Sequence, residues 1–229
     1  MKTDLHIHSC LSPCGSDDMY PFDLVGMAKV MGLDLIALTD HNSAKNCPAA
    51  EKAAREYGIG FLPGVEINTA EEVHCVCLFP DVSSAMSFDE MLYGHIPDIK
   101  NREAVFGRQI IVAPDGTEKT EPRLLITATD ISIMELPKIV RRYGGLMYPA
   151  HVDRDANGLF MMLGAWPRDL DVCAAEYVRS DEGVPDGIVR VQASDAHYFE
   201  NMSEGFELPL SSADFRGLAE YLTGGGVQK

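Results

Sequence analysis

Histidines and carboxylates recur at the ends of apolar segments along the whole chain. Six of its seven histidines fall in five short motifs, carboxylates accompany four of these motifs, and only His95 stands apart. Imidazole nitrogens and carboxylate oxygens are ligands of Zn, Mn and Fe(II). The distribution therefore predicts a fold that gathers the motifs around metal ions. The five motifs are Asp4-Leu5-His6-Ile7-His8, Thr39-Asp40-His41-Asn42, Gly64-Val65-Glu66 followed by His74, Pro149-Ala150-His151, and Ser194-Asp195-Ala196-His197.

The motifs lie next to segments with the pattern of short strands, and helical segments alternate with several of these strands. Strands that alternate with helices favour parallel βα units. Barrel enzymes built from such units carry their functional side chains at the carboxyl ends of the strands. We expect strands at residues 3–7, 33–39, 61–67, 72–79, 146–150, 173–178 and 188–193, and helices at 20–31, 44–57, 132–143 and 211–222.

One connection breaks the parallel pattern. Glu66 and His74 are only eight residues apart, whereas a crossover between parallel strands needs a dozen residues or more. We therefore expect the strands at 61–67 and 72–79 to form an antiparallel hairpin. That geometry places Glu66 and His74 at the same rim.

Residues 83–131 form the least motif-like stretch, and we expect them to be an insertion within a single domain that spans residues 1–229. Within it, residues 106–113 and 123–127 are expected to pair as a β-hairpin across the turn sequence Ala113-Pro114-Asp115-Gly116. The insertion is a candidate lid over the site or a candidate contact in a homo-oligomer. His95 lies inside it and is expected to be a surface residue.

Charge and composition narrow the classes of partner. The net charge is −16, with 35 acidic and 19 basic residues and no basic run. Polyanions gain affinity from Lys and Arg, so long nucleic acid is not expected to be a partner. No apolar run approaches the roughly 20 residues of a membrane span, so no membrane partner is expected. The first motif begins at Asp4 without an apolar leader before it, which favours a cytoplasmic protein.

The six cysteines are expected to be reduced thiols, as is usual in the cytoplasm. Cys75 and Cys77 alternate on an expected strand and are predicted to lie in the core. Cys10, Cys14 and Cys47 lie on loops that leave metal motifs. Two interpretations stay open for these three: structural thiols, or soft ligands near the metals.

The spacing within the motifs suits shared metal ions. His6 and His8 are two residues apart on an expected strand, so both imidazoles point to one face and can reach a single ion. Asp195 and His197 repeat this spacing near the other end of the chain. Glu66 is a carboxylate at a strand end, where it is able to bridge two metals.

Together the motifs resemble the polymerase and histidinol phosphatase (PHP) superfamily of metal-dependent phosphoesterases. The resemblance covers nearly the whole chain apart from the insertion. It implies a distorted (β/α)7 TIM-like barrel, here with a β-hairpin insertion, and two or three divalent metal ions (Zn, Mn or Fe) at the C-terminal rim. The ligands that it implies are His6, His8, Glu66 and Asp195 for one ion, Glu66, His74 and His151 for a second, and His41 and His197 for a third.

The third ion lacks the partner that the family usually provides. Members of the family carry Asp or His about five residues after the His-x-His pair, and this chain has a proline there. Asp18 is our candidate for the missing ligand, with Asp17 and Cys14 as alternatives. Asp4 and Asp40 are expected to orient neighbouring imidazoles rather than to bind metal.

The expected metals define a mechanism of hydrolysis. A water between two cations has its pKa lowered towards neutrality, which gives a hydroxide that attacks phosphorus. His197 and His41 are candidate proton donors to the leaving oxygen, and Asp195 completes the expected catalytic set. Arg154 and Lys45 are candidate cations for binding the phosphate of the substrate.

These expectations favour a phosphoesterase that hydrolyses a small phosphomonoester or a short nucleotide. A histidinol phosphate phosphatase would share the fold and is one alternative. The others are a metal-dependent hydrolase of another ester or amide and a non-catalytic metal-binding accessory module. The nearly complete set of ligands favours an enzyme.

Overall fold

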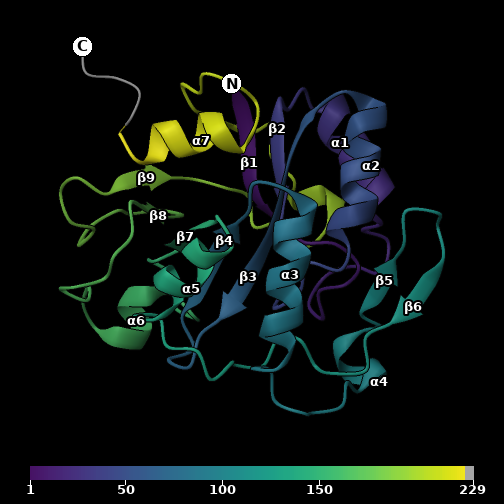
Figure 1. Cartoon of the computed structure of the whole chain (residues 1–229), viewed down its shortest axis with the longest axis horizontal. Helices are drawn as coiled ribbons and strands as arrows, with labels where there is room; N and C mark the ends of the chain where they lie inside the picture. Colours follow the sequence, from purple (N-terminus) through teal and green to yellow (C-terminus); the bar gives the residue numbers. More distant parts are fainter. Residues whose placement is uncertain (225–229) are drawn as a thin grey trace.

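The structure is a computed structural model that describes residues 1–224 of the chain (Figure 1). Strands form its centre and helices lie around them (Figure 1). In chain order the elements are β1 (Lys2–Ile7), α1 (Pro21–Val30), β2 (Leu35–Leu38), α2 (Cys47–Tyr57), β3 (Gly60–Asn68), β4 (His74–Leu78), α3 (Val82–Tyr93), α4 (Glu103–Phe106), β5 (Ile110–Val112), β6 (Glu118–Thr120), α5 (Leu136–Arg142), β7 (Leu146–Pro149), α6 (Leu159–Leu163), β8 (Ala174–Glu176), β9 (Val189–Val191), the 3₁₀ helix η1 (Phe199–Asn201), β10 (Phe206–Glu207) and α7 (Phe215–Leu222).

A six-stranded sheet in the order β10-β1-β2-β3-β4-β7 curls into a half barrel. β1, β2 and β3 run parallel, whereas β4 runs antiparallel to both β3 and β7. β8 and β9 form a separate parallel pair, and a parallel bridge joins Ala196 to Ile7 at the end of β1. The expected mixed α/β class is confirmed, while the count of seven βα units stays a prediction.

The expected hairpin between the third and fourth strands is confirmed. Asn68 pairs with His74, and Glu66 pairs with Val76, so β4 returns directly along β3. This pairing requires a close approach at Gly64, where a Cβ atom would lie 2.8 Å from the carbonyl oxygen of Cys77. The glycine of the Gly64-Val65-Glu66 motif therefore serves the packing that brings Glu66 to the rim.

Apolar side chains are buried on both faces of the central strands, as expected for strands covered on both sides. One core cluster joins the sheet to α1, α2 and α3 through residues such as Val25, Ala53 and Phe88. A second cluster contains Leu5 and Leu35 and extends to α7. In Figure 1, α1 and α2 lie side by side along one flank of the sheet.

The seven expected strands and four expected helices all occur, but three of the helices start three or four residues later than expected. Asp214 caps α7 by accepting a hydrogen bond from the backbone N–H of Gly217, so this helix begins at Phe215. The side chain of Glu71 accepts hydrogen bonds from Ser132 Oγ and Ile133 N, which hold these residues outside α5.

The expected insertion differs from the structure at its beginning. Residues 82–93 form α3, whose Ala85, Phe88 and Leu92 are buried in the main core. This helix had a signal in the sequence, because Asp81 is an N-cap that accepts a hydrogen bond from Ser84 N at 2.8 Å. An insertion within a single domain stays a prediction.

The expected hairpin within that segment is correct in its turn and wrong in its second strand. β5 pairs with β6 (Glu118–Thr120), and residues 123–127 lie outside this hairpin. The chain reverses at once, because Gly116 N donates to Ala113 O and Ala113 N donates to Thr117 O. The β5–β6 hairpin and α4 lie at one edge of the molecule in Figure 1.

None of the helices within residues 1–224 is both long and apolar enough to cross a membrane.

Candidate metal centre

The strands bring eight predicted ligands to one rim of the sheet. His6 lies in β1, His41 follows β2, Glu66 lies in β3, His74 begins β4 and His151 follows β7. In three overlapping groups, ligand atoms lie within 4.8 Å of one another. The groups are His6, His8, Glu66 and Asp195; His41, Glu66 and His74; and His8, His41 and His197.

The first group joins the two ends of the chain. The Nε2 atoms of His6 and His8 lie 3.1 Å apart. Asp195 Oδ1 lies 3.0 Å from His8 Nε2 and 3.3 Å from His6 Nε2, and Glu66 Oε1 lies 3.3 Å from His6 Nε2. All four side chains are buried. Their ligand atoms converge on a single point, as a bound ion requires.

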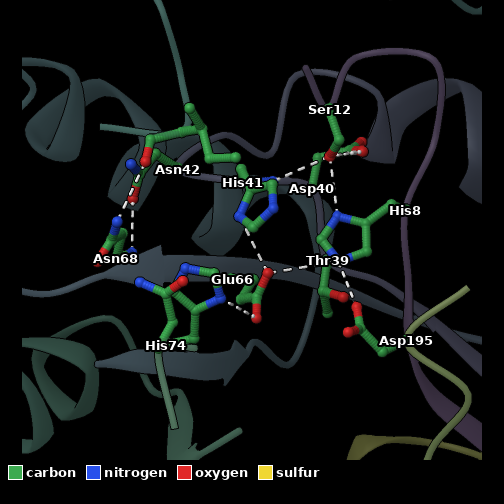
Figure 2. Close-up of polar contacts among 12 residues, drawn as sticks. His8, Ser12, Thr39, Asp40, His41, Asn42, Glu66, Asn68, His74 and Asp195 are labelled. Carbon is green, nitrogen blue, oxygen red and sulfur yellow. Dashed lines mark hydrogen bonds and ion pairs between the residues drawn. The ribbon is translucent and has the colours of Figure 1, made fainter. Parts of the chain in front are cut away.

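Glu66 lies in the middle of the cluster, where its two oxygens face different histidines (Figure 2). Oε1 lies 2.9 Å from His74 Nδ1 and 3.1 Å from His151 Nε2. Oε2 lies 3.0 Å from His41 Nδ1 and 3.3 Å from His8 Nε2. This is the arrangement needed for a carboxylate that is shared between ions.

The third group consists of three imidazoles, and Asp18 is not among them. The side chain of Asp18 is exposed, because the neighbouring Met19 is the residue that points into the core. The backbone N–H of Ser16 donates a hydrogen bond to the carbonyl oxygen of His197, which fixes this loop. Asp17 instead pairs with Arg108, whose Nε lies 2.8 Å from Asp17 Oδ2. The structure therefore does not bring Asp18 into the ligand groups.

None of the three cysteine positions left open joins these groups within residues 1–224. Cys10 and Cys47 are buried, and Cys14 is half-buried. Burial, followed by the nearby charges of Glu66 and Asp195, raises the pKa of the Cys14 thiol. Cys10 and Cys47 therefore fit the interpretation of structural thiols. Cys14 lies near the rim, and its raised pKa keeps it a protonated thiol.

A relay through Ser12 orients His8 (Figure 2). The single hydroxyl proton of Ser12 is donated to Asp40 Oδ1 at 2.7 Å, so Ser12 Oγ accepts from His8 Nδ1 at 2.9 Å. His8 Nε2 is thereby left free to face the cluster. Asp40 also accepts hydrogen bonds from the backbone and hydroxyl groups of Ser9. Asp40 thus acts on an imidazole indirectly, through a serine that the sequence analysis did not identify.

Two further contacts support the rim. Asp4 Oδ1 accepts a hydrogen bond from Ser194 N at 3.0 Å, so it fixes the loop of Asp195 rather than an imidazole. Glu176 contacts His6 Nδ1 at 3.0 Å and was missed by the sequence analysis. Its one signal in the sequence was a lone carboxylate within the apolar strand at 173–178.

Three residues at this rim have a left-handed backbone conformation. His151, Asp195 and Asn42 have positive φ values of 29°, 50° and 48°. Such conformations cost about 1–3 kcal/mol each in residues other than glycine. The side chain of Asn42 compensates by accepting from Asn68 N and donating to two backbone carbonyls of residues 125–127 (Figure 2).

The donor atoms suit divalent metal ions. Buried ligand atoms without a hydrogen-bond partner, which usually require an explanation in a folded protein, include His41 Nδ1, Glu66 Oε2 and Asp195 Oδ1. Burial lowers the pKa of His41 to about 4 and that of His197 to about 3, so both are held as neutral imidazoles. Neutral imidazole with carboxylate is a donor set for Zn, Mn or Fe(II).

A cavity of about 140 Å³ opens onto the cluster, and Arg154 lies at its wall. Arg154 Nη1 is 2.5 Å from Asp195 Oδ2, and 41% of its side chain is exposed. The loop of Arg154 packs directly against Gly158, where a Cβ atom would clash with the carbonyl oxygen of Arg154. The residues that line the cavity are His41, Glu66, His74, His151, Arg154, Ala156, Asn157, Asp195 and His197.

Lys45 does not line this cavity, so the structure does not bring this predicted phosphate ligand to the site. Its ammonium forms an ion pair with the buried Glu121 and lies 4.2 Å from the centre of the Tyr93 ring. The ion pair with this buried carboxylate holds the ammonium of Lys45 outside the cavity. The expected surface position of His95 is confirmed, and it pairs with Asp130.

The sequence model of the PHP domain matches residues 4–130, which is more than half of the chain. The matched segment contains the first three strand-end motifs and His74. The chain belongs to the PHP domain family, as its motifs predicted.

Similar proteins include curated relatives and solved structures. An uncharacterized protein of Methanocaldococcus jannaschii is 32% identical over 101 residues, which are 40% of this chain and 59% of that protein. A 5′-3′ exoribonuclease of Haemophilus influenzae is 40% identical over 80 residues, 34% of this chain and 28% of the relative. This chain thus spans less than two thirds of the length of either relative. Endonuclease Q in complex with a 27-mer duplex has the same fold, with a TM-score of 0.69, 19% identity, and coverage of 100% of this chain and 57% of that one.

The expectation that long nucleic acid is excluded as a partner is wrong. The structural neighbour was solved with a DNA duplex, and the Haemophilus relative is an exoribonuclease. The expectation failed because net charge describes the whole surface, whereas ligand binding depends on the local field of a site. Bound cations are often the largest local charges there.

Proposed function

We propose that this chain is a metal-dependent phosphoesterase that cleaves a phosphate ester at the cavity described above. The observation that carries the proposal is the position of Glu66, which contacts histidines of all three ligand groups. Phosphoester hydrolysis commonly uses neighbouring ions that hold the attacking and leaving oxygens. Glu66 would help to hold more than one such ion, because its two oxygens face different histidines.

We assign two to three divalent ions to the ligands that the resemblance implied. When bound, these ions supply Lewis acidity and activation of water. The first ion falls to the group that contains His6 and Asp195, and the second to the side of Glu66 that faces His74 and His151. The third ion would be held by His41 and His197, together with His8.

Arg154 is the side chain that we assign to binding the phosphate of the substrate. The guanidinium group of Arg154 carries several N–H donors beside the cavity, and only one of its nitrogens pairs with Asp195. The remaining donors suit two oxygens of a phosphate. Burial lowers the pKa of both His197 and His41, so neither carries the extra proton that a leaving oxygen would need, and we assign both imidazoles to metal binding.

The size of the cavity limits what enters it. Pockets that enclose whole small ligands usually measure about 300–1,000 Å³, and this one measures about 140 Å³. We infer that the phosphoryl group enters and that the rest of the substrate lies outside. This geometry suits a small phosphomonoester, a nucleotide, or the phosphorylated end of a longer chain.

A substrate screen tests the reaction class. Purified protein loaded with Mn(II) is assayed against nucleoside monophosphates, histidinol phosphate, 5′-phosphorylated oligonucleotides, duplex DNA with an abasic site, and a panel of amides. We expect release of phosphate or cleavage of a phosphodiester, with loss of turnover in Asp195→Ala. Asp130→Ala, which removes a surface carboxylate that pairs with His95, is the control. Hydrolysis of amides alone, or full activity in Asp195→Ala, would refute the proposal.

A further inference from the structure

Glu176 is a buried carboxylate that no expected motif contains. It ends β8, and its side chain is only 2% exposed. Its backbone carbonyl accepts from Val152 N at 2.8 Å, which ties β8 to the segment after β7. The side chain extends from there to His6 on β1. Glu176 therefore connects β8 to β1 of the half barrel, next to the ligand cluster.

Glu176 fixes which nitrogen of His6 faces the cluster. His6 Nδ1 lies 3.0 Å from Glu176 Oε2 and 3.2 Å from Oε1. A carboxylate only accepts hydrogen bonds, so Nδ1 carries the hydrogen. Nε2 then faces Glu66 and Asp195, each 3.3 Å away, where it would offer its lone pair to a metal ion.

The same carboxylate supports a second ligand. Glu176 Oε1 accepts a hydrogen bond from the backbone N–H of His151 at 3.2 Å. His151 has a strained φ of 29°, and its Nε2 lies 3.1 Å from Glu66 Oε1. One side chain thus holds histidines on both sides of the shared Glu66.

Glu176 is not compensated by a lysine or an arginine. Among the ion pairs within residues 1–224, its only partner is His6. A buried carboxylate without a cationic partner is costly. A metal ion at Nε2, on the other side of the imidazole from Glu176, would provide the missing positive charge, as in carboxylate–histidine–metal triads.

We propose that Glu176 is a positioning residue of the metal centre, which holds His6 in its metal-binding tautomer, supports the backbone of His151 and strengthens metal binding. His8 differs, since its Nδ1 contacts the neutral hydroxyl of Ser12. The inference rests on the metal centre of the proposed function and is independent of the substrate.

The test compares Glu176→Gln with the wild type and with Glu121→Gln as the matched control. Glu121 is equally buried, but its partners are Lys45 and Tyr93, outside the ligand groups. Metal-stripped proteins are titrated with Mn(II) and Zn(II) in competition with a chromophoric chelator, and thermal unfolding of the metal-free proteins is measured in parallel. We expect about 10- to 100-fold weaker metal binding in Glu176→Gln, as for other partners of metal-bound histidines, and unchanged binding in Glu121→Gln.

The two measurements separate positioning from packing. Metal affinity of Glu176→Gln equal to the wild type would overturn the proposal, whatever happens to thermal stability. Glu176→Ala should weaken binding at least as much; if it fails to fold, the nearly isosteric Gln variant still decides. A wild-type protein that binds no metal would instead refute the metal centre of the proposed function.

Discussion

At the scale of single residues, the two histidines of the first motif obtain their orientation from different partners. His6 donates to the carboxylate of Glu176, whereas His8 donates to Ser12, which in turn donates to Asp40. Both arrangements leave Nε2 for metal. The second depends on one hydroxyl group that has three contacts, because Ser12 Oγ also accepts from His41 N at 3.1 Å.

Ser12→Ala should therefore weaken metal binding and lower stability. The change leaves the N–H groups of His8 and His41 without an acceptor, at a cost of about 1–3 kcal/mol. We expect metal affinity to fall by about 10-fold, the lower end of such effects. Metal titration and chemical denaturation measure the two quantities. Ser16→Ala, in the same loop but away from His8 Nδ1, is the control, and an equal loss in both variants would contradict the relay.

Arg154→Lys should reduce turnover more than a conservative exchange usually does. Lysine keeps the positive charge but lacks the planar fork that binds two oxygens. Loss of one charge-assisted hydrogen bond, about 1.5–3 kcal/mol, corresponds to a decrease in kcat/KM of roughly 10- to 100-fold. Steady-state kinetics on the substrate found in the screen checks this expectation. Arg141→Lys, in a surface pair with Asp171, should show wild-type kinetics, and an unchanged kcat/KM in Arg154→Lys would remove Arg154 from phosphate binding.

At the scale of elements, the β3–β4 hairpin places Glu66 and His74 at one rim. Its existence followed from the sequence, because eight residues are too few for a parallel crossover. The helix α3 was missed, although its buried positions recur at helical spacing, because the segment lacks a metal motif. The expected strand at 123–127 was wrong because local turn geometry, rather than strand propensity, fixed the return of the β5–β6 hairpin.

Gly64→Ala tests the close packing of that hairpin. A Cβ at this position would lie 2.8 Å from Cys77 O, Leu78 Cδ2 and Thr39 Cγ2, and backbone cannot move aside cheaply. Overpacking of this kind costs about 1–3 kcal/mol. Urea denaturation should show this loss. Gly94→Ala is the control, since Gly94 is exposed with an ordinary φ of −71°, and equal stability of both variants would contradict the packing argument.

At the scale of the whole molecule, the fold brings buried imidazoles and carboxylates from both ends of the chain to one place. Without metal, several of their atoms lack partners. A ligand that binds only the folded state stabilises it by about 2.7 kcal/mol at 100 times its Kd. Metal binding to the cluster should therefore raise the thermal stability of the protein.

Saturating Mn(II) or Zn(II) should raise the unfolding midpoint of the metal-stripped protein. For a chain of this size, 2.7 kcal/mol corresponds to roughly 5–10 °C. Differential scanning calorimetry with and without metal measures the shift. Glu66→Gln should lose most of it, because the shared carboxylate contacts every group. A wild-type midpoint that metal does not change would contradict the proposed centre.

The sequence by itself determined the α/β class, the family and the kinds of ligand, because strand-end motifs depend on residue identity and short spacings. Only the tertiary structure decided which neighbours complete them. Asp18 turns outward beside the buried Met19, Lys45 is held by Glu121, and Glu176 reaches His6 from a position 170 residues later in the chain. Such contacts depend on distances across the half barrel, and no pattern along the chain records those distances.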